Sequence, residues 1–185
     1  MNDSWGWVAN DTDYKSVPSL VEYLVETVTA GGNLLLNVGP RGDGTFPTEA
    51  VERLAAIGTW VLRHGEAVYG VARGLDRWQC RLPTARRSTD DGERIYAYLT
   101  LRPADTLVLR DIPVNRVRSV RRLSDARLLQ WTAVPALPEV HRGAVDPRGE
   151  LVIAMTEDDA AGLCPVFAVD LAPPQARLST RRLTP

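Results

Sequence analysis

The feature that most constrains the fold is the segment at residues 33–38, which contains an uninterrupted apolar run. Three consecutive leucines form its centre, and Gly32 and Gly39 bound it. A run of this length is too short for a helix and is typical of a strand buried on both faces, as in a parallel sheet covered by helices. Such a strand needs a neighbour on each edge, but the downstream sequence supplies no further unit of this type. The chain therefore holds only part of a parallel α/β arrangement.

A helix is predicted on each side of this run. Apolar residues recur at helical spacing through residues 16–30, and Gly31 follows as a stop signal. A second helix is predicted from Pro47 to about Gly65, because proline suits the first turn of a helix and glycine its end. We expect one apolar face on this second helix, formed by Val51, Leu54, Ala55, Val61 and Leu62.

The pattern changes from about Leu75 onward. Short segments rich in β-branched, leucine and aromatic residues alternate with turn signals, which is typical of an antiparallel β-sandwich. The predicted strands are residues 94–101, 105–109, 117–123, 128–132, 151–155 and 166–171. We expect the sandwich to occupy residues 75–173 and residues 174–185, which are rich in proline and arginine, to form a tail without a core.

Charge and hydropathy exclude several classes of function. The net charge is −1, from 22 basic and 23 acidic residues, so nothing favours nucleic acid, which needs clustered positive charge. No stretch approaches the ~20 apolar residues that cross a bilayer, and the polar, aromatic N-terminus lacks the regions of a secretory signal. The sequence predicts neither a nucleic-acid partner nor a membrane segment, and it indicates no compartment.

Metal and thiol chemistry is poorly supported. His64 and His141 have no carboxylate or cysteine at ligand spacing, so we expect neither a metal site nor a cofactor. Cys80 and Cys164 are too far apart in sequence for a metal knuckle or redox pair. They could form a disulfide across one domain, but two buried free thiols are the favoured interpretation.

Four acidic residues invite comparison with the paired carboxylates of glycoside hydrolysis. These residues are Asp43, Glu49, Glu52 and Glu66. Glu49 and Glu52 stand where a helix start favours negative charge, and Asp43 lies between glycines, where turn chemistry accounts for it. No pair among the four demands a catalytic role.

Trp5 and Trp7 flank a glycine in a segment without helical or strand period. Aromatic faces stack on the apolar faces of sugar rings, and nearby polar residues can bond to hydroxyl groups, which is the usual mixture of a ligand pocket. The polar neighbours are Asn2, Asp3 and Asn10. The competing interpretation is that both indole rings fill core space.

Several runs together resemble the end of the catalytic barrel of α-L-fucosidases, glycoside hydrolase family 29. The runs are Asn2-Asp-Ser-Trp-Gly-Trp, Tyr14-Lys-Ser-Val, Gly31-Gly-Asn-Leu-Leu-Leu-Asn-Val-Gly-Pro, Gly42-Asp-Gly-Thr, Glu52-Arg-Leu and Gly65-Glu-Ala-Val-Tyr-Gly. The resemblance covers residues 1–72, and residues 75–173 more loosely resemble the family's C-terminal β-sandwich. It implies a fold that is α/β plus all-β, with the terminal portion of a (β/α)₈ barrel followed by that sandwich.

The resemblance also implies a reaction, which is the retaining hydrolysis of terminal α-L-fucose by an aspartate nucleophile and a glutamate acid/base. In the family both carboxylates precede the Ser-Trp-Gly stretch, so we expect them upstream of Met1 and none in this chain. A complete (β/α)₈ barrel needs about 250 residues, more than the 185 present.

The resemblance assigns Trp5 to the wall of the fucose pocket and Trp7 to the support of its loop. It assigns Asn37 and Gly39 a structural role at a strand end. The expected partner is a fucosylated oligosaccharide or glycoconjugate. Two alternatives remain open at this stage, a non-catalytic carbohydrate-binding β-sandwich module and a gene product without activity.

Overall fold

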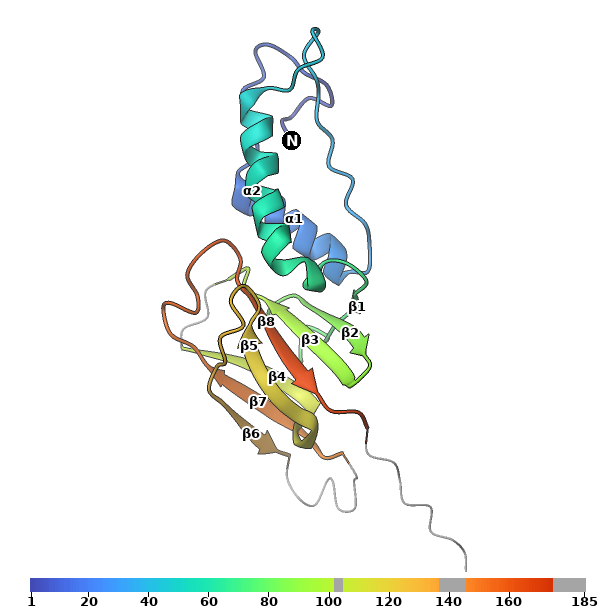
Figure 1. Cartoon of the computed structure of the whole chain (residues 1–185), viewed down its shortest axis with the longest axis vertical. Helices are drawn as coiled ribbons and strands as arrows, with labels where there is room; N and C mark the ends of the chain where they lie inside the picture. The colour runs from blue at the N-terminus through green and yellow to red at the C-terminus, as the bar shows by residue number, and fades with distance from the viewer. Residues whose placement is uncertain (102–104, 137–145, 175–185) are drawn as a thin grey trace, which may run out of the picture.

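The computed structural model describes residues 1–101, 105–136 and 146–174. Two helices pack on one face of a five-stranded sheet, and a three-stranded sheet packs on its other face (Figure 1). The predicted tail beyond residue 174 and His141 lie outside the described residues. The antiparallel β-sandwich predicted from the second half of the sequence is confirmed.

Helix α1 spans Val17–Thr29 and begins at Ser16, whose hydroxyl accepts a hydrogen bond from the backbone N–H of Ser19 at 3.3 Å. This bond satisfies one of the free N–H groups at the helix start. The predicted apolar face is confirmed, because the residues at helical spacing are buried. The buried residues are Leu20, Val21, Val25 and Val28.

Helix α2 spans Thr48–His64, close to the predicted bounds, and the 3₁₀ helix η1 (Gly65–Ala67) continues it. The predicted apolar face of α2 is wrong. Leu62 is 88% exposed and Val51 is 49% exposed, whereas the helix buries Ala50, Trp60 and His64. The helix carries apolar residues on two sides, and only one side meets α1 and the sandwich.

Residues 33–38, predicted as a buried parallel strand, form no strand in this structure. Leu35 is 93% exposed and Leu34 is 37% exposed. The physical reason is that no other part of the described chain runs beside this segment as a parallel strand, so its backbone finds no ladder partner. The described residues accordingly form no closed barrel.

The five-stranded sheet is antiparallel throughout, in the order β1-β2-β3-β8-β5. Its strands are β1 (Ala72–Arg73), β2 (Thr84–Thr89), β3 (Gly92–Tyr98), β8 (Val166–Leu171) and β5 (Val117–Arg122). Strand β2 was not predicted, because its sequence Thr-Ala-Arg-Arg-Ser-Thr contains no apolar run.

The three-stranded sheet is also antiparallel, in the order β4-β7-β6. Its strands are β4 (Thr106–Pro113), β7 (Arg148–Ala154) and β6 (Trp131–Pro135), and the 3₁₀ helix η2 (Val114–Arg116) follows β4. Each of these strands overlaps a segment that was predicted as extended, but the bounds are shifted by a few residues.

Alternating side chains on β3 explain how the layers are held together. Ile95 and Ala97 belong to the core between the two sheets, whereas Tyr96 and Tyr98 belong to the core beneath the helices. Because successive side chains of a strand point to opposite faces, a run that is apolar at every position suits a strand covered on both faces. Strand β8 does the same, with Phe167 facing one core and Ala168 the other.

The two cysteines are free, with Cys80 buried and Cys164 half-buried. Burial raises the pKa of the Cys164 thiol to about 12, so the thiol stays protonated and unreactive at neutral pH. Among the described residues, no helix combines the length and the apolar character that a bilayer crossing requires.

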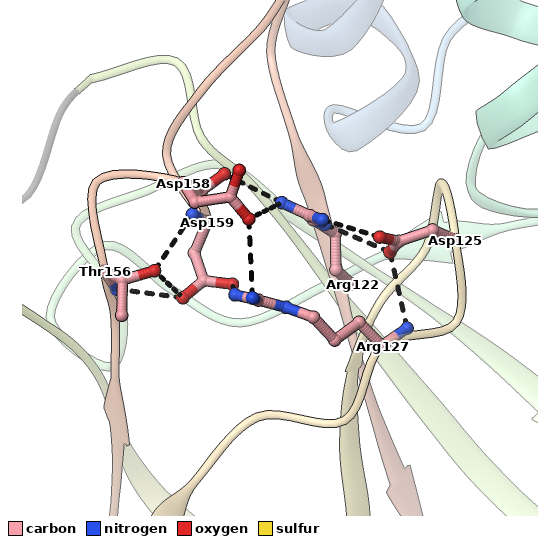
Figure 2. A network of polar contacts seen from close by, with 6 residues as sticks. All are labelled: Arg122, Asp125, Arg127, Thr156, Asp158 and Asp159. Carbon is pink, nitrogen blue, oxygen red and sulfur yellow. Dashed lines mark hydrogen bonds and ion pairs between the residues drawn. The ribbon is translucent and has the colours of Figure 1, made fainter.

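A polar network ties the loop after β7 to the turn after β5 (Figure 2). Asp159, which is 2% exposed, accepts hydrogen bonds from the backbone N–H of Thr156 at 2.9 Å and from its hydroxyl at 2.6 Å. The guanidinium of Arg127 also pairs with Asp159, and Arg122 binds Asp125 and Asp158. These contacts satisfy a buried carboxylate, which would otherwise be costly.

Candidate functional site

The N-terminal segment lies at the end of the helices remote from the sheets, and the extended segment before α2 runs along the helices and meets it there (Figure 1). The N-terminal ammonium of Met1 donates a hydrogen bond to the backbone carbonyl of Asn37 at 3.0 Å, and the N–H of Lys15 donates to the carbonyl of Met1 at 3.0 Å. The two segments thus form one surface, on which both predicted sugar-binding tryptophans are found.

Asp11 shapes the loop that carries these tryptophans. Its carboxylate accepts hydrogen bonds from the backbone N–H of Ser4 at 2.8 Å and from the side-chain amide of Asn2 at 2.9 Å. Hydrogen bonds from Ser4, with a smaller contribution from Asn2, hold the pKa of Asp11 below its ordinary value, because they favour the charged form. The loop is closed around an ionised carboxylate.

Trp5 projects from this loop into solvent, with 89% of its surface exposed. Its backbone is held in place, because the side-chain amide of Asn37 donates a hydrogen bond to the carbonyl of Trp5. The core-filling interpretation is therefore wrong for Trp5 in this chain. A fixed backbone under an open aromatic ring leaves the indole face free to stack on another group.

Trp7 is placed differently, with 40% of its surface exposed. It lines a small hollow with Val38, Gly39 and Ala50 that has no room for a water molecule. A Cβ at Gly39 would lie only 2.3 Å from the backbone nitrogen of Trp7, so glycine is required for this close approach. These contacts are what a residue supporting the loop would make.

The polar neighbours of the tryptophans differ in how far they are already engaged. The Asn2 amide is used by Asp11, and the Asp3 carboxylate lies 3.6 Å from the ammonium of Lys15 while its side chain stays 76% exposed. Asn10 is exposed. Asp3 and Asn10 therefore remain accessible to a ligand.

The four acidic candidates are not assembled into a catalytic pair by any contact in the structure. Asp43 accepts hydrogen bonds from the N–H and the hydroxyl of Thr45, at 2.9 and 2.7 Å. These bonds lower its pKa and confirm the turn interpretation. Glu49 and Glu52 lie exposed in the first turns of α2, where negative charge suits the helix N-terminus.

Glu66 occupies the junction between the helices and the sandwich. Its carboxylate accepts hydrogen bonds from Arg94 on β3 at 3.0 Å and from Arg121 on β5 at 2.9 Å, and from the Tyr96 hydroxyl at 3.3 Å. Asp170 on β8 lies beside the same two arginines. The role of Glu66 is to join two layers, so its carboxylate is not free for catalysis.

His64 is also part of this junction. Its ring lies 4.8 Å from that of Trp60, its Nδ1 is 2.9 Å from the Trp60 carbonyl, and its Nε2 is buried without a hydrogen-bond partner among the described residues. Burial lowers the pKa of His64, so the ring is neutral. Across the described ranges, no three His, Cys, Asp or Glu side chains are grouped to hold a metal ion.

Sequence reasoning missed two features of this region. One is the hydrogen bond from Asn37 to Trp5, and the other is the group formed by Glu66, Arg94, Arg121 and Asp170. The signal for the second was the presence of arginine or aspartate within strands that also contribute buried apolar residues. Such charges are costly near a core unless paired, but their partners lie 28 to 76 positions away.

Comparisons with known proteins agree on one family. The model of the family described as Alpha-L-fucosidase matches residues 1–66. Plasma α-L-fucosidase of Rattus norvegicus is 34% identical over 139 residues, which are 70% of this chain and 29% of the rat protein.

Solved structures give the same result over nearly the whole chain. α-L-Fucosidase isoenzyme 1 from Paenibacillus thiaminolyticus superposes with a TM-score of 0.71 at 26% identity, covering 92% of this chain and 38% of that one. The Thermotoga maritima α-fucosidase in complex with fucose superposes with a TM-score of 0.66 at 28% identity, covering 91% of this chain and 38% of that one.

Fold and sequence together place the chain among the glycoside hydrolases. More specifically, the chain belongs to the α-L-fucosidase family and corresponds to the C-terminal part of the family's fold. It spans less than a third of the length of the rat protein and well under half of each solved structure.

Proposed function

We propose that the chain is the C-terminal part of an α-L-fucosidase that releases terminal α-L-fucose from oligosaccharides or glycoconjugates. In this proposal residues 1–72 are the last portion of the catalytic (β/α)₈ barrel, and residues 75–173 are the sandwich that packs against it. The observation that carries the proposal is the family match over residues 1–66, the segment from which Trp5 projects.

Exposed apolar surface supports the barrel assignment. Leu35 and Leu62 are 93% and 88% exposed, and no strand of the described part of the chain runs beside residues 33–38. Large exposed apolar side chains and an unpaired extended backbone indicate a surface that another part of the protein covers. Adjacent barrel strands would supply hydrogen bonds to residues 33–38, and a neighbouring helix would cover the second apolar side of α2.

Trp5 takes the role of a wall of the fucose pocket. The indole face would stack on the apolar side of the sugar, and Asn37 would hold the backbone of Trp5 in place. Trp7 and Gly39 would fix the loop from behind. Stacking of this kind positions the sugar and does not itself break a bond.

The chemistry itself requires groups from elsewhere. A retaining hydrolase uses one carboxylate to attack the anomeric carbon and a second to protonate the leaving oxygen and later to activate water, with the two about 5 Å apart. The acidic residues discussed above are committed to turns, a helix start and the junction. As the resemblance to α-L-fucosidases implies, the nucleophile and the acid/base would come from the part of the barrel that precedes Trp5.

The coding DNA before the codon for Met1 tests this proposal. We expect one continuous reading frame that adds strand and helix units, with an aspartate and a glutamate at strand ends. A stop codon directly before Met1 would contradict the barrel assignment for the natural product.

A second candidate function is a non-catalytic carbohydrate-binding module. The observation that favours it is that the sandwich has a complete core of its own, while Trp5 is open to solvent. Binding of a fucosylated oligosaccharide by the chain, abolished in Trp5→Ala and without a longer reading frame upstream, would favour the module over the enzyme.

A further inference from the structure

A second cavity lies far from Trp5, where the C-terminal end of α1 meets β1 and β2. Its volume is about 450 Å³, which is within the range of small-molecule sites. The residues of the N-terminal segment lie at the opposite end of the helices (Figure 1). Five charged side chains line the cavity, and they are Glu26, Arg73, Asp76, Arg77 and Arg81. We call this cavity the α1–β2 groove.

Three of these charges have no partner within the described parts of the chain. Arg73 pairs with Asp76 at 3.4 Å. Neither an ion pair nor a side-chain hydrogen bond engages Arg77, Arg81 or Glu26 there. The lining of the groove therefore includes both free guanidinium donors and a free carboxylate acceptor.

The floor of the groove is apolar. Leu75, Leu82 and Pro83 contribute to it, and Leu82 is only 7% exposed. The hydroxyl of Thr84 is occupied by the backbone N–H of Leu75 at 2.6 Å. An apolar floor below a rim of polar groups is the usual composition of a ligand site.

The rim is rigidly supported. The N–H groups of Gln79 and Cys80 donate to the carbonyl of Asp76 at 2.9 and 3.0 Å, and the Gln79 amide donates to the carbonyl of Arg110 on β4 at 3.3 Å. Trp78 stands on this anchored turn with 61% of its surface exposed. A fixed turn presents its side chains without a large ordering cost on binding.

We propose that the α1–β2 groove is a second saccharide-binding site, separate from the pocket that includes Trp5, and that it takes a neutral oligosaccharide. Sugar hydroxyls both donate and accept hydrogen bonds, so they match a rim of arginines facing Glu26 and Asp76. The lining holds three arginines and two carboxylates, and the unpaired carboxylate of Glu26 would repel an anionic ligand.

The inference rests on the proposed function only in taking the ligand to be a glycan. The test is an NMR titration of the ¹⁵N-labelled 185-residue chain with neutral 2′-fucosyllactose and, separately, with acidic 3′-sialyllactose, at about 1–10 mM sugar, where weak binding is measurable. We expect the neutral sugar to shift the amide signals of residues 26–30 and 73–84.

Variants separate this groove from the Trp5 surface. The double variant Arg77→Ala/Arg81→Ala should weaken binding at residues 73–84 at least about fivefold. The matched control Arg118→Ala removes an exposed arginine of β5 and should leave the affinity measured at residues 73–84 unchanged.

Each result decides the matter. Groove shifts that are lost in the double variant support the proposal, whether or not residues 1–11 also respond. Shifts confined to residues 1–11, no shifts at all, a response only to sialyllactose, or equal binding by the double variant would each overturn it. If the amide signals of residues 1–11 do not shift while those of the groove do, the result counts against the role proposed for Trp5 and leaves the groove supported.

Discussion

The carboxylate of Glu66 accepts a hydrogen bond from the guanidinium of Arg121 at 2.9 Å, across 55 positions of sequence. Glu66 lies in η1 directly after α2, and Arg121 lies on β5. The same oxygen accepts from Arg94 at 3.0 Å. One carboxylate therefore joins the helical part of the chain to two strands of the sandwich.

Glu66→Gln should destabilise the chain by about 1–3 kcal/mol, because it removes the charge that two half-buried arginines share. Urea unfolding measures this. The matched control is Glu150→Gln, since Glu150 forms an exposed pair with Arg110 at 2.9 Å, and exposed pairs contribute little, about 0–1 kcal/mol. Equal effects of the two substitutions would show that the junction does not depend on Glu66.

Gly39→Ala should disturb the tryptophan loop. The new Cβ would lie 2.3 Å from the nitrogen of Trp7 and 2.5 Å from the carbonyl carbon of Gly6, and overpacking against backbone costs about 1–3 kcal/mol. Thermal unfolding and the amide signals of residues 6–7 report the change. Gly42→Ala is the control, because nothing lies within 4 Å of its Cβ position. A Gly39 variant as stable as the Gly42 variant would contradict the close approach.

Stability should fall as the pH drops below about 6.5. Burial, with a smaller contribution from Arg63, lowers the pKa of His64 below its ordinary value of 6.5. Below that value the unfolded chain binds a proton that the folded chain excludes, so folding becomes less favourable. Urea midpoints between about pH 7.5 and about pH 5.5 measure the loss. His64→Gln should remove most of this pH dependence, and an unchanged dependence would exclude His64 as its source.

Asp159→Asn should destabilise the sandwich by about 1–3 kcal/mol, because it weakens hydrogen bonds to a charged, buried group. Burial alone would raise the pKa of Asp159. The hydrogen bonds from Thr156 and the contact with Arg127 nevertheless hold this pKa below its ordinary value. Differential scanning calorimetry compares it with Asp158→Asn, whose carboxylate is 68% exposed. A larger loss from Asp158→Asn would mean that the network shown in Figure 2 is anchored elsewhere.

Local sequence signals predicted most elements of the fold. Gly31 and the proline and glycine near the ends of α2 bounded the helices to within a few residues. Most strands were found because their apolar runs alternate with turn signals. Strand β2 was missed, since arginine occupies two of its central positions and the pairing with β3 decides its conformation.

Features that depend on distant parts of the chain were not predictable. The buried side of α2 was chosen wrongly, because apolar residues occur on two sides of the helix and only the packing of Trp60 against the sandwich distinguishes them. The strand expected at residues 33–38 needs neighbours that the described chain does not provide. Trp5 was singled out from the sequence as a candidate, whereas its hydrogen bond to Asn37 came only from the structure.

The hydrolysis of an aryl α-L-fucoside by the purified 185-residue chain tests the account most directly. The account places Trp5 in the wall of a fucose pocket and the catalytic aspartate and glutamate outside this chain, so it predicts no release of the aryl group above the rate in buffer. Hydrolysis of the fucoside that copurifies with the chain and is lost when Trp5 is replaced by alanine would contradict this prediction, because the chain would then hold its own catalytic carboxylates.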